Sequence, residues 1–480
     1  MTTTIVWFRK DLRLHDHPAL YEAASNGKVV SVFIWTPEDE KVYGGSEPSL
    51  WWLHHSLKEF EHRLNGLGIQ LVIRKGDSLQ ILAELAQEIQ ADGVYFNERF
   101  EPEHRAKDEE TVAMLRLLDL DVQIFRGNLL FNPYTLKNSK GDPFKVFTAY
   151  WKRSLEEFVP PPLPAPDLQG IESECSSMTV EALGFPSQRD WADCFQEIWN
   201  PGEQSAIGKW EDFMEEGLLY YGAERDLFAG ESSAVSMLSP SIAAGDISVR
   251  SMWHSAKRVG DASVLPAVQN STISFLRQLA WRDFAYYQLL WFPHFVDQPL
   301  LTYFTHFPWN GTVEQLERWE QGKTGYPLVD AGMRELKTTG VIHNRVRMVV
   351  ASFLVKHLLI PWTEGSDWFR KSLIDYDMAN NAMGWQWVAG TGIDAAPYFR
   401  IFNPTAQSEK FDPNGDYIRQ WVPELADLPA PHIHKPWETP PALLREANVQ
   451  LDLTYPRPII DHKMARKRAL QAYNELRKKD

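Results

Sequence analysis

Short apolar runs and longer amphipathic segments alternate over the first part of the chain. The amphipathic segments have helical spacing and lie at residues 49–67, 79–90 and 103–118. The apolar runs are rich in β-branched residues, as is typical of strands buried on both faces of a sheet. These runs are residues 3–8, 29–35, 70–74, 93–97 and 122–125. Strands that alternate with helices predict a parallel, doubly wound α/β sheet.

The pattern changes at a proline-rich segment. Residues 160–166 read PPPLPAP, a sequence that neither a helix nor a central strand accommodates. Beyond Pro201 the apolar positions have helical spacing and strand patterns largely disappear. One predicted helical face consists of Ala206, Trp210, Phe213 and Met214. We therefore expect an α/β domain at residues 1–130, an interdomain linker at 131–200 and a larger all-α domain at 201–480.

The composition narrows the class of protein. The chain has 480 residues, which is more than one ordinary core accommodates. It has no apolar run of eighteen residues, and its first residues lack the features of a secretion signal. Two cysteines fit a reducing compartment. We therefore expect a cytoplasmic protein without a membrane partner.

The net charge and one missing motif argue against general nucleic-acid binding and against a dinucleotide-binding fold. The formal net charge of -15 argues against general attraction to nucleic acids, whose phosphates are neutralised by Lys and Arg. If the protein binds DNA, it needs a local basic patch on an acidic body. No G-x-G-x-x-G motif follows the first predicted strand, so the dinucleotide-binding fingerprint is absent.

The densest cluster of unusual residues runs from about position 322 to 405. Polar side chains alternate there with aromatic ones, a combination that favours a pocket for a flat ring system with polar edges. Asp375 and Asp377 could accept hydrogen bonds from ring N–H groups or a ribose, or they could form a solvated turn. The stretches concerned are residues 323–327 (KTGYP), 343–348 (HNRVRM), 375–377 (DYD), 380–381 (NN), 384–387 (GWQW) and 396–404.

These stretches resemble a known family. Residues 5–16 (IVWFRKDLRLHD) are similar to the opening motif of the DNA photolyase and cryptochrome family. Residues 323–327 and 385–404 are similar to its flavin domain, and the resemblance covers nearly the whole chain. It is strongest to bacterial class I cyclobutane pyrimidine dimer photolyases. The resemblance implies an α/β antenna domain followed by an all-α FAD-binding domain, and light-dependent repair of cyclobutane dimers in ultraviolet-damaged DNA by a monomer.

The resemblance also implies a set of flavin-binding positions. Val235 and Met237 depart from the family, which usually has Thr and often a basic residue there. Asn381 matches the side chain that faces flavin N5, where a neutral amide suits the protonated, reduced ring (FADH-). The positions that match are Tyr221, Val235, Ser236, Met237, Leu238, Ser239, Phe275, Gln278, Arg282, Asp375, Tyr376, Asp377 and Asn381.

Three tryptophans match the family's electron-transfer chain. Trp385, Trp362 and Trp309 would carry an electron from the surface to photoexcited, oxidised flavin. Indole suits this role because it is readily oxidised by one electron. Each of the three, taken alone, is more typical of a core tryptophan.

Substrate-binding positions follow in the same way. Trp281 and Trp387 match the aromatic walls that sandwich a flipped-out dimer, and Asn344 and Met348 match positions that line the cavity. The DNA backbone contacts would come from Arg225, Arg345 and Arg400.

Gln278 departs from the cyclobutane enzymes, which usually carry Glu there, and matches the (6-4) photolyases. Those enzymes also use a pair of histidines near the lesion. Here His343 stands without a second histidine, because the stretch ends in Arg347 and Met348. We therefore favour the cyclobutane dimer as the substrate, with the (6-4) product as the alternative.

The antenna and the function class have alternatives. Residues 48–53 and 96–108 lie in the family's antenna region, but Glu103 and His104 do not reproduce the Asn-Glu pair of folate-binding relatives. Both 5,10-methenyltetrahydrofolate and 8-hydroxy-5-deazaflavin therefore remain candidates. The main alternative is a cryptochrome photoreceptor. The short chain beyond Lys463 argues against it. An electron-transfer flavoprotein would leave Trp281, Met348 and Trp387 unexplained.

Overall fold

The computed structural model describes residues 2–43, 45–171, 175–186, 192–228 and 234–478. Its contacts divide the chain into two compact units, and each is described by itself. The sheet unit comprises Met1–Gly222, Ser233–Pro293 and Ile374–Ala379. The helical unit comprises Ala223–Ser232, His294–Leu373 and Asn380–Asp480.

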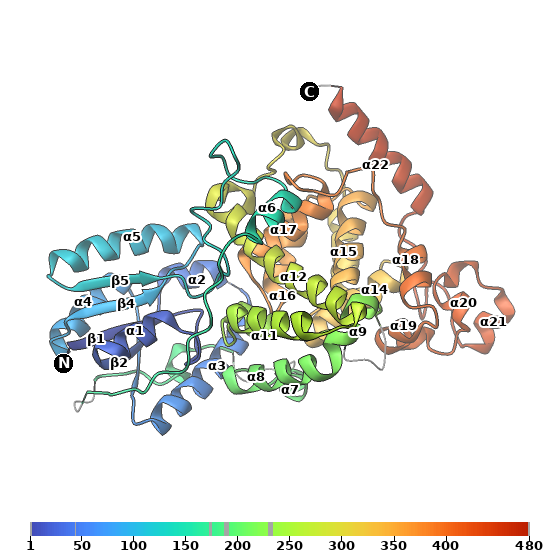
Figure 1. Ribbon diagram of the computed structural model, residues 1–480. Helices are drawn as coiled ribbons and strands as arrows, with labels where there is room; N and C mark the ends of the chain where they lie inside the picture. Colours follow the sequence, from blue (N-terminus) through green and yellow to red (C-terminus); the bar gives the residue numbers. More distant parts are fainter. Residues whose placement is uncertain (1, 44, 172–174, 187–191, 229–233, 479–480) are drawn as a thin grey trace. The chain divides into compact units, whose positions relative to one another are not determined.

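A five-stranded sheet organises the sheet unit (Figure 1). The strands run in the order β3-β2-β1-β4-β5, and all four pairings are parallel. The bounds are β1 (Thr2–Phe8), β2 (Gly27–Trp35), β3 (Leu71–Lys75), β4 (Gly93–Asn97) and β5 (Asp121–Phe125). The parallel sheet expected from the alternating pattern is confirmed, and each strand begins and ends within two residues of its predicted bounds.

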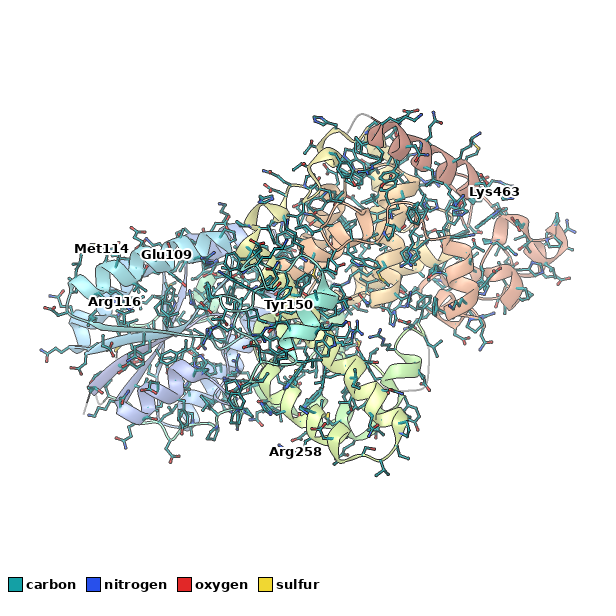
Figure 2. The ribbon with its side chains drawn as sticks, turned by 45° about the horizontal axis from the view of Figure 1, so that its top comes forward. Glu109, Met114, Arg116, Tyr150, Arg258 and Lys463 are labelled. Carbon is teal, nitrogen blue, oxygen red and sulfur yellow. The ribbon has the colours of Figure 1, made fainter. Side chains whose placement is uncertain are left out.

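Helices cover both faces of this sheet because β1 alternates its side chains between two cores. Val6 and Phe8 pack with α1 and α3, whereas Ile5 and Trp7 pack with α4 and α5. This arrangement makes the sheet doubly wound. The helices are α1 (Pro18–Asn26), α3 (Glu47–Gly66), α4 (Ser78–Ile89) and α5 (Pro102–Leu117). Figure 2 shows Glu109, Met114 and Arg116 along α5, all of them exposed.

The segment predicted as a linker packs against the sheet unit. The Gln70 side chain bonds to both the N–H and the carbonyl of Cys175 at 2.9 Å. Farther along, the Met178 N–H donates to the carbonyl of Ile73 at 2.8 Å. Residues 175–178 therefore lie along β3, the strand at the end of the sheet. The domain boundaries at 130 and 200 stay predictions.

Several further helices belong to the sheet unit. The short helix α6 (Phe147–Ser154) packs on the long helix α12 (Pro266–Trp291), which runs beside α11 (Val249–Ala262). Helix α8 (Glu203–Asp212) continues into a π-helical turn at Phe213–Gly217. Of the predicted apolar face, Ala206, Trp210 and Phe213 are buried and Met214 is half-buried.

The helical unit contains no strand among its described residues, apart from an isolated bridge between Leu451 and Tyr455. The fold class expected from the sequence, an α/β part followed by a largely helical part, is thus confirmed. No helix within the described ranges is long and apolar enough to cross a membrane. The helices used below are α14 (Pro327–Thr339), α15 (Asn344–Ser352), the π-helical segment η5 (Phe353–His357), α16 (Trp362–Ser372), α17 (Met378–Ala389), α18 (Pro404–Phe411), α20 (Ala430–Ile433) and α22 (His462–Arg477).

Candidate functional site

The predicted flavin positions are divided between the units: Asn381 belongs to the helical unit and the others to the sheet unit. In the sheet unit, three of them share one side of α12. Phe275, Gln278 and Arg282 recur at helical spacing, so their side chains leave the helix on one face. Arg282 is held there because its guanidinium donates to the carbonyl of Asn128 at 2.7 Å. Tyr221 contacts the same face, with its ring edge-on to Phe275 at 5.5 Å.

The predicted phosphate loop makes a sharp turn ahead of α10 (Ser239–Ala244). Met237 has a φ of +50°, the left-handed region that a residue with a side chain seldom adopts. The buried side chain of Leu238 anchors the turn, whereas Val235 and Met237 are exposed. Ser236 is half-buried and Ser239 is exposed.

Asp375, Tyr376 and Asp377 are buried, which rules out the solvated turn. The Tyr286 hydroxyl donates to the Asp377 carboxylate. Burial of such carboxylates is costly unless hydrogen-bond donors compensate it. The stretch is therefore a fixed polar element of the sheet unit, and it retains carboxylate oxygens that can accept hydrogen bonds.

Asn381 is oriented by a neighbouring helix of its own unit. Its side-chain Nδ2 donates to the carbonyl of Ser366 at 3.1 Å and to the Ser366 hydroxyl at 3.0 Å. The donor side of the amide is thus engaged on α16, and the amide oxygen is the group left to accept. An acceptor is what a protonated ring nitrogen requires, so Asn381 fits a reduced flavin.

Four predicted residues meet in one small cavity of the helical unit. Asn344, Met348, Asn381 and Trp385 line a space of about 60 Å³ between α15 and α17. Arg347 and Asn380 line the same cavity. The sequence analysis placed both in its cluster of unusual residues but assigned neither a role. Each lies next to a residue that was assigned a role, and the charge of Arg347 and the amide of Asn380 are the signals that could have indicated one.

The three tryptophans of the predicted chain follow one another along the helical unit. The Trp385 ring lies against Gly365, where a Cβ would come within 2.1 Å of the indole, and Gly365 is one helical turn beyond Trp362 on α16. Asn310 and Gly311 directly follow Trp309, and their N–H groups both donate to the carbonyl of Leu359.

The three side chains differ in exposure only at the last position. Trp385 is 2% exposed, Trp362 is 3% exposed and Trp309 is half-buried. The terminal ring of Trp309 packs on Phe307 at 4.4 Å. The series thus has two buried members and one member that solvent can reach.

The predicted DNA-contacting arginines differ in the groups that they contact. Arg345 forms an ion pair with Asp226 and lies 4.7 Å over the ring of Phe411. The carbonyl of Arg225 accepts from His343, while Arg400 is exposed and its carbonyl accepts from Lys356. Arg345 therefore needs to exchange a carboxylate for a phosphate before it can contact DNA.

His343 has a structural position in this cluster. Its Nδ1 accepts from the Arg345 N–H at 3.2 Å and caps α15, and its Nε2 lies 3.0 Å from the carbonyl of Arg225. Burial lowers the pKa of His343. Both ring nitrogens of His343 are thus engaged by backbone groups.

The KTGYP stretch at 323–327 builds the start of α14. The N–H groups of Thr324 and Gly325 both donate to the buried carboxylate of Asp330, at 2.7 and 3.0 Å. Gly325 has a φ of +82°, and a Cβ there would collide with the carbonyl of Arg457. Tyr455 donates to the same carboxylate at 2.6 Å. These contacts hold the C-terminal segment against α14.

The antenna region of the sheet unit is filled by ion pairs. Arg99 contacts Asp39 at 2.6 Å and Glu101 at 3.0 Å, and His104 also contacts Asp39 at 2.9 Å. Glu103 is half-buried and pairs with Lys41 at 2.9 Å. A cavity of about 20 Å³ remains beside Arg99 and Glu101, and a larger one of about 320 Å³ lies along α5.

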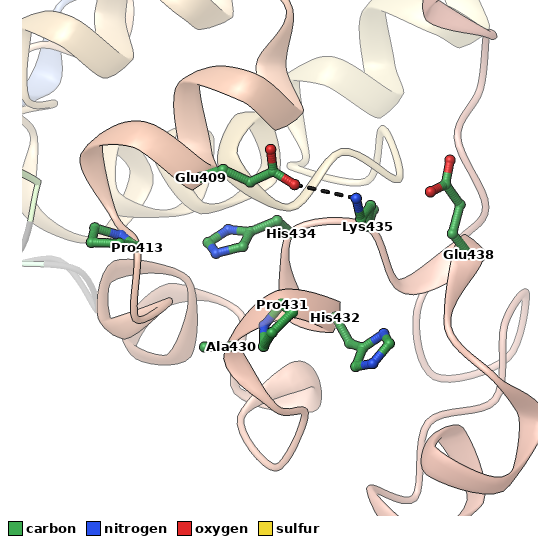
Figure 3. A pocket seen from close by; sticks show the side chains of 8 residues that line it. All are labelled: Glu409, Pro413, Ala430, Pro431, His432, His434, Lys435 and Glu438. Atoms are coloured by element: carbon green, nitrogen blue, oxygen red, sulfur yellow. Dashed lines mark ion pairs between the residues drawn. The ribbon is translucent and has the colours of Figure 1, made fainter.

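A further cavity of about 390 Å³ lies in the helical unit between α18 and α20 (Figure 3). The ion pair between Lys435 and Glu409 crosses one side of it at 3.3 Å. His434 bonds to the Ser408 hydroxyl at 2.7 Å. None of the predicted site residues lines this cavity. The residues drawn are Glu409, Pro413, Ala430, Pro431, His432, His434, Lys435 and Glu438.

Family profiles match two parts of this chain. A family profile described as DNA photolyase matches residues 4–167, and one described as FAD binding domain of DNA photolyase matches residues 275–475. FAD as the cofactor is thus confirmed at the level of the family.

Similar proteins include enzymes and photoreceptors. The deoxyribodipyrimidine photo-lyase of Agrobacterium fabrum is 43% identical over 99% of this chain and 98% of its own length. Cryptochrome-2 of Arabidopsis thaliana is 36% identical over 99% of this chain and 79% of its own length. The crystal structure of a bacterial class III photolyase from Agrobacterium tumefaciens has a TM-score of 0.94 and 42% identity, covering 100% of this chain and 98% of that chain. The chain therefore belongs to the DNA photolyase and cryptochrome family.

Proposed function

We propose that the protein is a light-dependent DNA repair enzyme that splits cyclobutane pyrimidine dimers. The observation that carries this proposal is the cavity lined by Asn344, Met348, Asn381 and Trp385. It combines positions expected for a flavin with positions expected for a lesion. A photoreceptor has no use for the lesion positions, and an electron-transfer flavoprotein would need only the flavin ones.

Residues of both units have the chemistry to hold FAD. In the sheet unit, Ser236 and Ser239 offer hydroxyls for phosphate groups, and the buried carboxylates of Asp375 and Asp377 can accept hydrogen bonds. In the helical unit, Asn381 presents its amide oxygen. When bound and reduced, FAD supplies the light-excited electron that opens the cyclobutane ring.

The tryptophan series would keep this cofactor in its reduced state. Trp385 is the buried end, Trp362 lies on the adjoining helix and Trp309 is the end nearest to solvent. Each indole can lose one electron and regain it from the next. The proposed direction of electron flow is therefore from Trp309 through Trp362 to Trp385.

The lesion positions favour the cyclobutane dimer over the (6-4) product. Repair of a (6-4) product needs a positioned acid, because a proton must reach the migrating group. His343, the histidine of the matching stretch, has both ring nitrogens engaged by backbone groups. A cyclobutane dimer needs an electron and neutral hydrogen bonds, which Gln278 can offer.

The subclass and antenna are further parts of the proposal. The sequence resemblance led us to expect class I, but the crystal structure from Agrobacterium tumefaciens at 42% identity is that of a class III photolyase. We therefore favour class III over class I for this chain. Both antenna candidates, the folate and the deazaflavin, remain open. The cavity along α5 is the first candidate for the antenna site.

The decisive experiment is a repair assay. Purified protein with reduced FAD is illuminated with an oligonucleotide that contains one cyclobutane thymine dimer, and restored thymines are quantified. We expect repair that requires light, and none on an oligonucleotide with a (6-4) product. Repair of the (6-4) product alone would reassign the substrate. Light-dependent flavin chemistry without repair of either lesion would favour the cryptochrome, which the 36% identity to Cryptochrome-2 keeps as the second candidate.

The tryptophan series has a separate test. Trp385→Phe should slow photoreduction of oxidised flavin by about tenfold or more, because phenylalanine is much harder to oxidise than indole. Repair by chemically reduced Trp385→Phe protein should persist. The matched control is Trp319→Phe, since Trp319 is equally buried and lies 6.3 Å from Trp385 but is outside the series. Equal photoreduction rates in the two variants would remove the series from the mechanism.

A further inference from the structure

Three aromatic rings form a pile between α6 and α12 of the sheet unit. Phe147 stacks on Trp281 with ring centres 3.6 Å apart and planes 10° apart. The ring of Trp151 is also nearly parallel to that of Phe147, with ring centres 6.4 Å apart and planes 13° apart. Trp281 is half-buried, whereas Phe147 is only 1% exposed. Phe147 is therefore a buried support beneath a partly accessible indole.

Helix α6 holds this support rigidly. Tyr150, one turn beyond Phe147 and labelled in Figure 2, packs on Phe284 at 5.0 Å and on Tyr287 at 5.2 Å of α12. The Tyr287 hydroxyl accepts from the Phe144 N–H at 2.9 Å and donates to the carbonyl of Leu136 at 2.7 Å. Hydrogen bonds and ring contacts thus fix the segment that carries Phe147 to the helix that carries Trp281.

The pile limits how Trp281 can be used. An indole has two faces on which a base can stack, and a ring at 3.6 Å occupies one of them. A flipped-out base can then stack only on the opposite face. The same contact prevents the indole from turning about its side-chain torsions, so the accessible face keeps one orientation.

We propose that Phe147 is a positioning residue for lesion recognition, because it fixes Trp281 as a one-sided platform. The proposal rests on the proposed function, in which Trp281 is a wall of the lesion site. Phe147 itself does not touch the substrate. Its effect should appear in the preference for damaged over undamaged DNA, because undamaged DNA does not place a base on the platform.

The test compares two substitutions of Phe147. Phe147→Leu keeps an apolar side chain but removes the flat ring, whereas Phe147→Tyr keeps the ring. The measured quantity is the ratio of Kd values of the FAD-bound protein for a duplex without a lesion and the same duplex with one cyclobutane dimer. We expect Phe147→Leu to lower this ratio by about three- to tenfold, the range set by the energy of one aromatic pair. Phe147→Tyr should keep the wild-type ratio.

A matched control separates positioning from general destabilisation. Phe60 is fully buried in the sheet core and packs on Phe8 at 4.8 Å, so Phe60→Leu removes a comparable ring away from α12. We expect Phe60→Leu to lower the Tm without changing the Kd ratio. An unchanged ratio in Phe147→Leu, or an equal change in Phe60→Leu, would overturn the proposal. A wild-type protein without any preference for the lesion would instead overturn the proposed function.

A second inference comes from the charge beside this pile. Arg277 lies one helical turn before Trp281 on α12, is exposed, and has its guanidinium 5.7 Å from the Phe147 ring centre. Among the described residues no carboxylate forms an ion pair with it. Arg345, in contrast, is paired with Asp226. We infer that Arg277 contacts a backbone phosphate next to the lesion and supplies part of the basic patch that an acidic chain needs.

The test is the salt dependence of DNA binding. Arg277→Gln should reduce the slope of log Kd against log salt concentration by about one, equally for damaged and undamaged duplexes. Arg258→Gln removes an exposed charge of the same kind from α11 and is the control. An unchanged slope in Arg277→Gln, or the same reduction in Arg258→Gln, would overturn the assignment.

Discussion

Charged side chains are buried in both units, but their partners differ. In the sheet unit, beyond the ends of the strands, Arg99 lies between Asp39 and Glu101. Burial alone would raise the pKa of the Asp39 carboxyl, but Arg99 and His104 lower it well below its usual range. The pKa of Glu101 is lowered in the same way, chiefly by Arg99 and Lys10. These groups stay ionised because each charge is compensated.

In the helical unit two buried bases, Lys356 and His357, have no ion-paired carboxylate among the described residues. Lys356 is 1% exposed, and its ammonium donates to the carbonyl of Arg400 at 2.9 Å. Among the described residues no carboxylate lies within ion-pair distance of it. Burial therefore lowers the pKa of Lys356 to about 7. Next to it, burial and the nearby His462 lower the pKa of His357 to about 3, and Nε2 of His357 lies 2.8 Å from Nδ1 of His462.

The difference shows that the partner, rather than depth of burial, decides whether a group is charged. In the sheet unit the carboxylates of the network stay ionised at physiological pH, because neighbouring positive charges compensate them. In the helical unit burial favours the neutral forms of the Lys356 amine and the His357 imidazole, so the surroundings of η5 respond to pH. Three substitutions test this contrast.

The largest effect is expected from breaking the compensated network. Arg99→Met would leave Asp39 and Glu101 buried with weaker partners, and the free energy of unfolding should fall by about 3–5 kcal/mol. Urea denaturation followed by circular dichroism measures it. The control is Lys58→Met, which breaks the exposed pair of Lys58 with Glu181 and should cost about 1 kcal/mol or less. A similar small loss in both variants would mean that Arg99 is not compensating buried charge.

A smaller effect of opposite sign is expected in the helical unit. With a pKa near 7 in the folded protein and an ordinary value of 10.5 in the unfolded chain, Lys356 releases its proton on folding between these pH values. The unfolded chain then binds more protons, so this group makes stability rise with pH over that window.

Lys356→Met should remove this dependence. At pH 6 the variant should be more stable than the wild type by on the order of 1–3 kcal/mol, and the gap should narrow toward pH 10. Thermal denaturation of both proteins at several pH values measures the gap. A gap that stays constant with pH would show that the amine is charged in the folded protein.

The smallest effect concerns the histidine pair. His462→Ala would remove the partner of His357 and leave a buried ring nitrogen without a hydrogen bond, at a cost of about 1 kcal/mol in unfolding free energy. His462→Gln keeps a polar partner and should recover most of the loss. Equal stability of the two variants at pH 7 would show that the contact contributes nothing.

The fold could be predicted from the sequence because its signals are local. Each strand of the sheet is an apolar run such as residues 93–97, and each lies within one or two residues of its predicted bounds. Helix α6 was not predicted. It has eight residues, and its Phe147 and Tyr150 are buried by contacts with α12, more than 130 positions away. No local pattern reveals such contacts.

The site shows the same division. Asn381, Trp385 and Met348 were found through the family resemblance, but the orientation of the Asn381 amide depends on Ser366 and could not be read from the motif. The pairing of Arg345 with Asp226 joins segments 119 residues apart. Arg277 carries no motif at all, and it draws attention only because its neighbours in space are Phe147 and Trp281.

The segment that lies along β3 has a consequence for fragments of this protein. Residues 175–178 occupy hydrogen-bonding groups of Ile73 and Gln70 that would otherwise face solvent. A fragment cut at residue 130 would keep all five strands but would lose this cover. Bare strand edges recruit strands from other molecules, so such a fragment should self-associate. Anyone isolating the sheet for chromophore-binding studies should therefore extend the fragment beyond Met178.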